Sequence, residues 1–160
     1  AKKVIKKLHS VDDFDNERIL DMETLNSKLE TVGTGKLFSV LDEVDTEELV
    51  LDYLQSDGWR ITKYSASDTQ SEYECELRRV GDGQIERAFL QVKSGNATVF
   101  PGDYEEMASF GHVFFFAETQ VAVGNRENMS EITSSELLAF AQESTGILPD
   151  PILLKLDAYL

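Results

Sequence analysis

The chain has 160 residues and a formal net charge of −15 at pH 7, with 41% hydrophobic and 28% charged residues. This length and composition are typical of one globular domain that buries a sizeable core without disulfides. Because affinity for nucleic acid comes chiefly from lysine and arginine, the acidic balance weighs against a nucleic-acid function unless basic residues gather locally.

Neither a membrane span nor a signal peptide is visible in the sequence. No stretch approaches the roughly 18 consecutive apolar residues of a membrane helix, and the lysine-rich start leads into acidic residues, so we expect a cytoplasmic protein. Cys75 alternates with apolar neighbours and is predicted to be a buried, unreactive thiol. His9 and His112 have no cysteine or second histidine at metal-ligand spacing, which argues against a zinc site.

Residues 1–44 have the least regular pattern and are predicted to form an N-terminal extension, mainly helical. Residues 4–8 suit either a strand or a helix, and residues 19–29 have helical spacing. Residues 33–35 are predicted to be a loop. The loop is followed by Lys36 but lacks the spacing of a phosphate-binding P-loop, so nucleotide binding is not expected there.

A main domain is predicted over residues 45–160, beginning with a helix. Asp45 is the expected N-cap, and Glu48 three residues later completes a capping box. The helix ends at Gly58, and residues 59–64 alternate as a strand.

A hairpin follows, with strands over residues 72–79 and 87–93. Its turn contains Asp82-Gly83, a strong signal for a tight hairpin. Residues 104–110 are a short helical candidate. Residues 112–117 are a continuous apolar run, which predicts a strand in the middle of a sheet.

The remaining elements are a further strand and two helices. Residues 119–123 are expected to form one more strand. Ser134 or Ser135 is expected to cap a helix that ends before Gly146, and Asp150-Pro151 begins the last helix.

The hairpin brings polar residues onto one face of the sheet. If the turn centres on Asp82 and Gly83, the numbers of cross-strand partners add to about 165, which places Glu74 opposite Gln91. Side chains alternate between faces, so one face collects the following polar residues: Glu72, Glu74, Glu76, Gln91 and Lys93. The other face is apolar and requires a core.

An acid beside an amide oxygen and a lysine is a pattern that suits hydrolysis of a phosphodiester. Carboxylate and amide oxygens hold a divalent metal, and the lysine orients or activates water near the phosphate. The same residues also suit an ordinary solvated face with cross-strand ion pairs. Basic residues gather near the hairpin in this acidic chain; they are Arg60, Lys63, Arg78, Arg79, Arg87 and Lys93.

The order helix, strand, strand, strand, helix, strand between Asp45 and Ala117 resembles the αβββαβ core of the restriction-endonuclease-like fold, the PD-(D/E)xK nuclease superfamily. The likeness rests on Glu48-Leu49-Val50 in the helix, Gly58-Trp59 after it, Tyr73-Glu74, and Gln91-Val92-Lys93. The glutamine two residues before the lysine makes this motif most similar to that of the Mrr-like branch. The resemblance implies an α/β domain with a mixed central sheet flanked by helices, with the N-terminal extension and C-terminal helices added to it.

The resemblance also implies roles for individual residues. Glu74 would be the acidic metal ligand, Gln91 the second metal-binding position and Lys93 the catalytic lysine. Glu48 on the helix would complete a site for Mg²⁺ or Mn²⁺. The strand acid is usually an aspartate in the superfamily. Here Asp68, Glu72 and Glu76 are alternative candidates to Glu74, and the pairing about the turn favours Glu74.

Two functions are consistent with these patterns. The first is a metal-dependent endonuclease that hydrolyses phosphodiester bonds in DNA. The second is a non-catalytic binding or assembly module of the same fold, for example in a defence system, whose acidity suits contacts with a partner protein chain.

Overall fold

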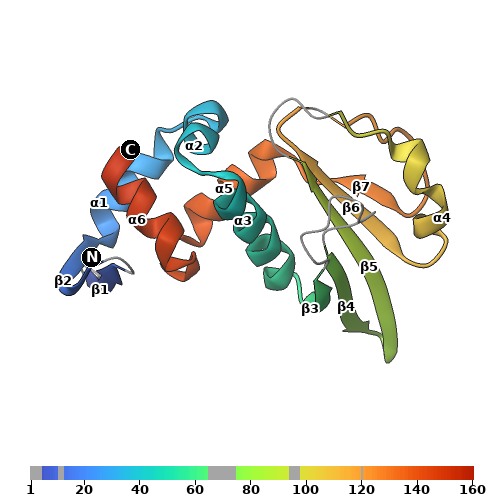
Figure 1. Cartoon of the computed structure of the whole chain (residues 1–160), viewed down its shortest axis with the longest axis horizontal. Coiled ribbons are helices and arrows are strands. Elements are labelled where there is room, and N and C mark those ends of the chain that lie inside the picture. Colours follow the sequence, from blue (N-terminus) through green and yellow to red (C-terminus); the bar gives the residue numbers. More distant parts are fainter. Residues whose placement is uncertain (1–4, 11–12, 65–74, 94–97, 120) are drawn as a thin grey trace. The chain divides into compact units, whose positions relative to one another are not determined.

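A computed structural model describes residues 5–10, 13–64, 75–93, 98–119 and 121–160 (Figure 1). The chain separates into two compact units. The first comprises Ala1–Leu49 and Leu137–Leu160, and the second comprises Val50–Glu136. Among the described residues, no helix combines the length and apolar character needed to cross a membrane.

The first unit joins a small antiparallel sheet to helices from both ends of the chain. Its elements are β1 (Ile5–Ser10), β2 (Asp13–Asp21), α1 (Met22–Glu30), α2 (Thr34–Val40), the start of α3 (Glu43–Ser56), most of α5 (Ser134–Glu143), the 3₁₀ turn η2 (Thr145–Ile147) and α6 (Asp150–Tyr159). The predicted start of α6 at Asp150-Pro151 is confirmed.

The beginnings of α1 and α2 differ from the sequence prediction. A helix was expected from Ile19, but β2 continues to Asp21, whose carboxylate then caps α1 by accepting hydrogen bonds from the backbone N–H groups of Glu23 and Thr24. The predicted loop over residues 33–35 is also too long, because α2 already begins at Thr34.

The cap of α3 lies one turn earlier than predicted. Asp42, rather than Asp45, is the N-cap: its Oδ1 accepts from the backbone N–H of Asp45 at 2.8 Å, while Asp45 Oδ2 accepts from the backbone N–H of Asp42 at 3.0 Å. This reciprocal pair is a capping box with aspartate at its third position. A similar shift occurs at α5, where Thr133 caps the helix through the N–H of Glu136, and neither Ser134 nor Ser135 does.

The second unit is built around a mixed five-stranded sheet of order β3-β4-β5-β6-β7. Its strands are β3 (Arg60–Tyr64), β4 (Cys75–Gly81), β5 (Gln84–Lys93), β6 (His112–Ala117) and β7 (Met129–Glu131). Pairs β3–β4 and β4–β5 are antiparallel, whereas β5–β6 and β6–β7 are parallel. The connection from β5 to β6 contains η1 (Pro101–Tyr104) and α4 (Glu105–Ala108), which Figure 1 shows beside the sheet.

The hairpin turn and its register are confirmed. Asp82 and Gly83 both have positive φ, at 51° and 76°, as a two-residue turn matching the twist of the strands requires. Partners from Gly81↔Gln84 to Cys75↔Leu90 follow the predicted pairing about this turn. Farther along, Gly111 leads closely past β5: a Cβ there would lie 2.6 Å from the carbonyl oxygen of Arg87.

The apolar run 112–117 forms an internal strand, as predicted. Phe115 and Phe116 point to opposite faces of the sheet and are fully buried. On the face that carries Phe115, the core includes Phe89, Val113 and Met107, with Tyr104 edge-on to the Phe115 ring at 5.2 Å. The strand predicted over 119–123 is wrong for its described residues, and the last strand is Met129–Glu131 instead.

We predict that Lys155→Met lowers the free energy of unfolding of the chain. Lys155 Nζ binds Asp45, whose side chain is only 6% exposed, and lies 2.8 Å from Asp42 Oδ2. Removing the cation leaves the Asp45 carboxylate buried without it, which costs about 1–3 kcal/mol. Denaturant unfolding at pH 7 measures the loss, and Lys36→Met, at an exposed position, is the matched control.

The same variant has a defined pH dependence. The hydrogen bond from Lys155, with a smaller contribution from the backbone N–H of Asp45, lowers the pKa of Asp42 from 3.8 to about 2. A carboxyl whose folded pKa is depressed adds stability above its unfolded pKa, and this stability disappears as pH falls through the folded value. The difference between the parent and Lys155→Met should therefore be largest above pH 4 and shrink toward pH 2. A difference that stays constant over this range would contradict the assignment.

Candidate functional site

The site predicted from sequence lies on one face of the sheet, here called the Gln91 face. On β5 it comprises Arg87, Phe89, Gln91 and Lys93, because alternate residues of a strand share a face. The residues of β6 that pair with Phe89, Gln91 and Lys93 are Val113, Phe115 and Ala117. Glu76 and Arg78 of β4 belong to the same face, since they pair with Phe89 and Arg87.

Gln91 is buried, which corrects the expectation of a solvated polar face. Its exposed fraction is 1%, because its neighbour Phe115 and the core beneath α4 cover this part of the sheet. Glu76 is also buried. Lys93, at the end of β5, is half-buried. The structure thus brings the amide and the amine onto one face, two residues apart, at the border between an apolar core and the end of the strand.

Glu74, the predicted acidic ligand, lies outside the described residues, as does Glu72. The last described pair on this side of the hairpin is Cys75↔Leu90. Cys75 itself is buried, as predicted. Among the described residues, no group of three or more histidine, cysteine, aspartate or glutamate side chains is arranged to hold a metal ion. A site that includes Glu74 therefore stays a prediction.

Glu48, the predicted helix acid, belongs to the first compact unit and is half-buried on α3. Burial raises the pKa of its carboxyl, and the nearby charges of Asp45 and Asp42 raise it further, partly offset by Lys155. These effects favour the protonated acid, whereas a metal ligand must be deprotonated. A cation that binds at Glu48 must therefore compete with a proton on a carboxyl whose pKa is higher than that of an exposed glutamate.

Glu76 is held by arginines on the Gln91 face. Its Oε1 accepts from Arg87 Nε at 2.6 Å and lies 3.9 Å from Arg78 Nη2, and it is also the cross-strand neighbour of Lys63. The Glu76 side chain is only 9% exposed, whereas the side chains of Arg78 and Arg87 are partly exposed to solvent. The buried carboxylate thus neutralises part of the positive charge of these two arginines. Glu76 is thus committed to ion pairs within the sheet.

The opposite face carries an aromatic and arginine cluster that sequence reasoning did not assemble. The Arg79 guanidinium lies 4.3 Å from the centre of the Trp59 ring and bonds to Glu86 and Asp57, while Trp59 meets Phe114 edge-on. A hollow of about 480 Å³ lies here. The register of β3 with β4 places Trp59 next to Arg79, so alternation traced from the Asp-Gly turn was the available signal.

His112 lines the same hollow in a structural arrangement. Its Nε2 is 2.7 Å from Ser130 Oγ, and its ring packs against Phe114. Burial, together with the positive charge of Arg79, lowers the pKa of His112. These contacts give His112 a structural role.

Asp52, on the half of α3 in the second unit, was not singled out from sequence. Its Oδ2 is buried and has no hydrogen-bond partner among the described residues, and burial raises its pKa. It follows Glu48 by one helical turn, so the two carboxyls share a side of α3. An i, i+4 pair of acids was the signal that could have found it.

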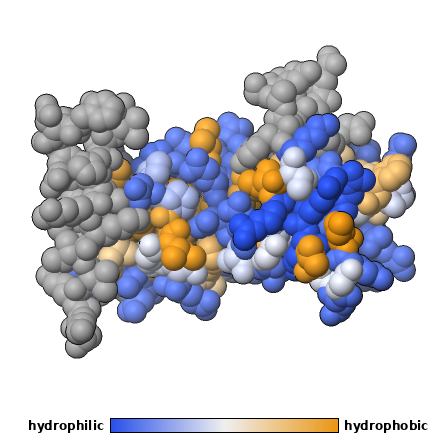
Figure 2. Space-filling view, turned by 90° about the horizontal axis from the view of Figure 1, so that it is seen from below, coloured by the Kyte–Doolittle hydropathy of each residue, from blue (hydrophilic) through white to orange (hydrophobic). Residues whose placement is uncertain are grey.

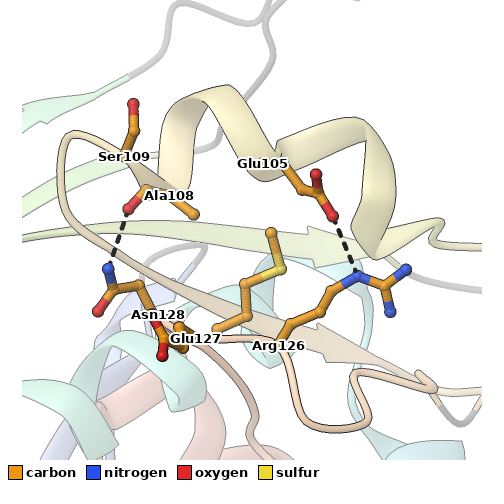
Figure 3. Close-up of a pocket in the computed structure, with 7 residues that line it drawn as sticks. Glu105, Ala108, Ser109, Arg126, Glu127 and Asn128 are labelled. Atoms are coloured by element: carbon orange, nitrogen blue, oxygen red, sulfur yellow. Dashed lines mark hydrogen bonds and ion pairs between the residues drawn. The ribbon is translucent and has the colours of Figure 1, made fainter.

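A second hollow, of about 310 Å³, lies between α4 and the loop before β7 (Figure 3). Arg126 reaches toward Glu105 with 3.6 Å between Nε and Oε1, and Asn128 donates to the carbonyl of Ala108 at 3.4 Å. Asn128 has a φ of 58°, a conformation that asparagine tolerates better than most residues. Its carbonyl accepts from Val113 N–H, which anchors the loop to β6. These contacts explain the loop without assigning it a reaction.

No family model and no curated relative matches the chain. Among solved structures, it is similar to the MspJI restriction endonuclease in complex with a 27-mer oligonucleotide, with a TM-score of 0.50 and 12% sequence identity. The chain has a restriction-endonuclease-like fold. The match covers 86% of this chain and 35% of that protein, so the chain corresponds to about a third of its length. The mixed α/β architecture predicted from sequence is confirmed.

We predict that Arg87→Gln destabilises the second unit through Glu76. The substitution leaves a nearly buried carboxylate without its closest cation, and the free energy of unfolding should fall by about 1–3 kcal/mol. Replacing both partners, with Glu76→Gln and Arg87→Gln, removes the uncompensated charge and should recover most of the loss. Urea unfolding of the parent, the two single variants and the double variant measures the coupling. Independent, additive effects would show that this ion pair does not hold the face together.

Proposed function

We propose that this chain is a metal-dependent nuclease domain that hydrolyses phosphodiester bonds in DNA. One observation carries the proposal: a restriction-endonuclease-like sheet presents a buried amide, Gln91, and a half-buried amine, Lys93, two residues apart at the end of its middle strand. The similar MspJI structure contains an oligonucleotide. The Gln91-x-Lys93 spacing also favours placing the chain in the Mrr-like branch.

The residues of the site suit Mg²⁺ or Mn²⁺. Carboxylate and amide oxygens are preferred ligands of these ions, so Glu74 and Gln91 would hold the cation and Glu48 would complete its ligands. Bound there, the ion would polarise a phosphate oxygen and lower the pKa of a water. Rigid burial suits Gln91 for this task, because the packed core restricts the rotamers of its side chain.

Lys93 supplies positive charge at the rim of the core. Its ammonium group would lie where negative charge develops on the scissile phosphate, and it would orient the attacking water. The same proposal assigns residues 45–160 as the nuclease domain. It also places the protein in the cytoplasm, where it would meet DNA.

A non-catalytic module of the same fold is the second candidate. The observation that favours it is the chemistry of Gln91, since an amide brings no negative charge to a metal site, in a chain whose net charge is −15. In this case the acidic surface would contact a partner protein, and the sheet would serve as a scaffold. Cleavage and metal binding separate the two candidates.

We predict that Lys93→Ala and Glu74→Gln each reduce chelator-sensitive DNA cleavage by at least about 100-fold, as loss of a group that stabilises transition-state charge does. The measurement is cleavage of plasmid and linear DNA with Mg²⁺ or with chelator. Lys36→Ala and Glu106→Gln, at exposed positions to which the proposal gives no role, are the matched controls. Full activity of Lys93→Ala would remove the lysine from the mechanism. Absence of both cleavage and Mn²⁺ binding in the parent would favour the non-catalytic module.

We predict that Gln91→Glu makes stability depend on divalent metal. A carboxylate at this buried position is costly without a compensating charge, so the variant should be less stable than the parent in chelator. A bound cation compensates the charge, and Mg²⁺ should raise its melting temperature more than that of the parent. Gln84→Glu, at an exposed position beside the hairpin turn, is the control and should show neither effect. Destabilisation that Mg²⁺ does not relieve would argue against a metal at Gln91.

A further inference from the structure

Three arginines form a row across the Gln91 face. Arg60 pairs with Arg78, and Arg78 pairs with Arg87, on the adjacent strands β3, β4 and β5. All three residues are exposed. With strands about 4.8 Å apart, the Cα atoms of the row span about 10 Å.

The row concentrates positive charge in an acidic protein. Like charges directly opposite one another destabilise a sheet, so such a row is not explained by strand pairing. Glu76 offsets part of the charge through Arg87 and Arg78. Exposed Lys63, the cross-strand neighbour of Glu76, adds a further cation, so among the described residues that surround the row, the positive groups outnumber the carboxylate of Glu76. The local field at the arginine row is therefore positive although the chain carries −15.

The hairpin tip adds an exposed apolar pair to the same face. Val80 pairs with Ile85, and their exposed fractions are 77% and 73%. They lie two residues beyond Arg78 and Arg87, toward the turn. This pair lines a hollow of about 390 Å³ together with Arg60 and Arg78. Figure 2 views the molecule from the side to which the hairpin tip points and shows hydrophilic surface interrupted by a few hydrophobic residues.

We propose that this arginine row binds the phosphate backbone of duplex DNA on the exposed half of the hairpin, on the same strand pair that carries Gln91 and Lys93 farther along. Guanidinium groups bind phosphate oxygens in a bidentate manner, and exposed aliphatic side chains suit contact with sugars. On β5, Gln91 follows Arg87 by four residues, which is about 13 Å at the rise of a strand. The link between this surface and cleavage rests on the proposed nuclease function, but the binding itself needs neither metal nor cleavage.

The test is fluorescence anisotropy with a labelled DNA duplex in chelator, repeated over a series of salt concentrations. For each arginine–phosphate ion pair that is removed, the slope of log affinity against log salt should become shallower by about 1. Arg60→Gln and Arg78→Gln should each weaken binding with this change of slope, and the double variant should change the slope by about 2. Circular dichroism and thermal melting show whether each variant keeps the fold.

Matched variants separate charge from folding. Arg126→Gln, at the arginine that pairs with Glu105 outside this face, should leave both affinity and slope unchanged. Arg87 is tested together with its partner, as Glu76→Gln with Arg87→Gln, because this double change removes no net charge. It should therefore keep the fold and alter the slope less than Arg60→Gln combined with Arg78→Gln.

The outcomes also distinguish this surface from the catalytic site. Lys93→Ala should lose cleavage while Arg60 and Arg78 still hold the duplex, with a salt slope shallower by at most about 1, so loss of cleavage with retained binding supports both proposals. Absence of cleavage with arginine-dependent binding would end the nuclease proposal and leave the surface in place. The surface proposal is overturned if the parent does not bind duplex at low salt, or if Arg60→Gln and Arg78→Gln bind with an unchanged slope. The same anisotropy assay with a labelled acidic polypeptide is the comparison. If the arginine variants lose affinity for the polypeptide but not for the duplex, the proposal is overturned and the face is assigned to a protein partner.

Discussion

Parallel pairing of β5 with β6 is the constraint on which the candidate site depends. It sets Gln91 beside Phe115 and Lys93 beside Ala117, so one face of β5 changes from apolar core to polar rim within a few residues. The buried amide of Gln91 requires a hydrogen-bond partner or another polar ligand. The close packing of the core around it fixes the position of this amide. The same pairing requires the long β5–β6 connection, whose η1 and α4 supply Met107 and Tyr104 to the core that covers Gln91.

Charge is distributed unevenly over the two faces of the hairpin. On the Gln91 face, arginines stand in a row with one buried carboxylate beneath them. On the opposite face, Arg79 is fully engaged by Trp59, Glu86 and Asp57, so adjacent arginines in the sequence have different tasks. The exposed side chain of Arg78 is accessible to a ligand, whereas Arg79 links β4 to Glu86 of β5 and to the segment before β3. In a protein with a large negative charge, such a row can restrict the binding of a polyanion to one surface, because acidic groups elsewhere repel the polyanion.

The sequence predicted the parts of the fold that short-range patterns determine. Asp82-Gly83 specifies the turn, and the turn together with alternation specifies the register from Cys75 to Gly81. The apolar run through Phe116 likewise predicts an internal strand. The three-residue β7 was missed because its strand conformation comes from pairing with β6 rather than from its own pattern. The cap of α3 was misplaced because Asp42 and Asp45 both begin a capping pattern, and only the structure shows which carboxylate bonds to the other's N–H.

The burial of Gln91 and Glu76 could not be predicted from alternation, which assigns polar residues to water. Gln91 pairs with Phe115, which belongs to the core that α4 helps to form, and Glu76 pairs with Phe89 of the same core. These neighbours are distant in sequence. A crystal structure grown with Mn²⁺ and phased with its anomalous signal tests the central claim most directly. The account predicts an anomalous peak about 2.1 Å from Gln91 Oε1, with Glu74 as a second ligand. Full occupancy of Mn²⁺ elsewhere, with the Gln91 amide bound only to protein groups, would contradict it.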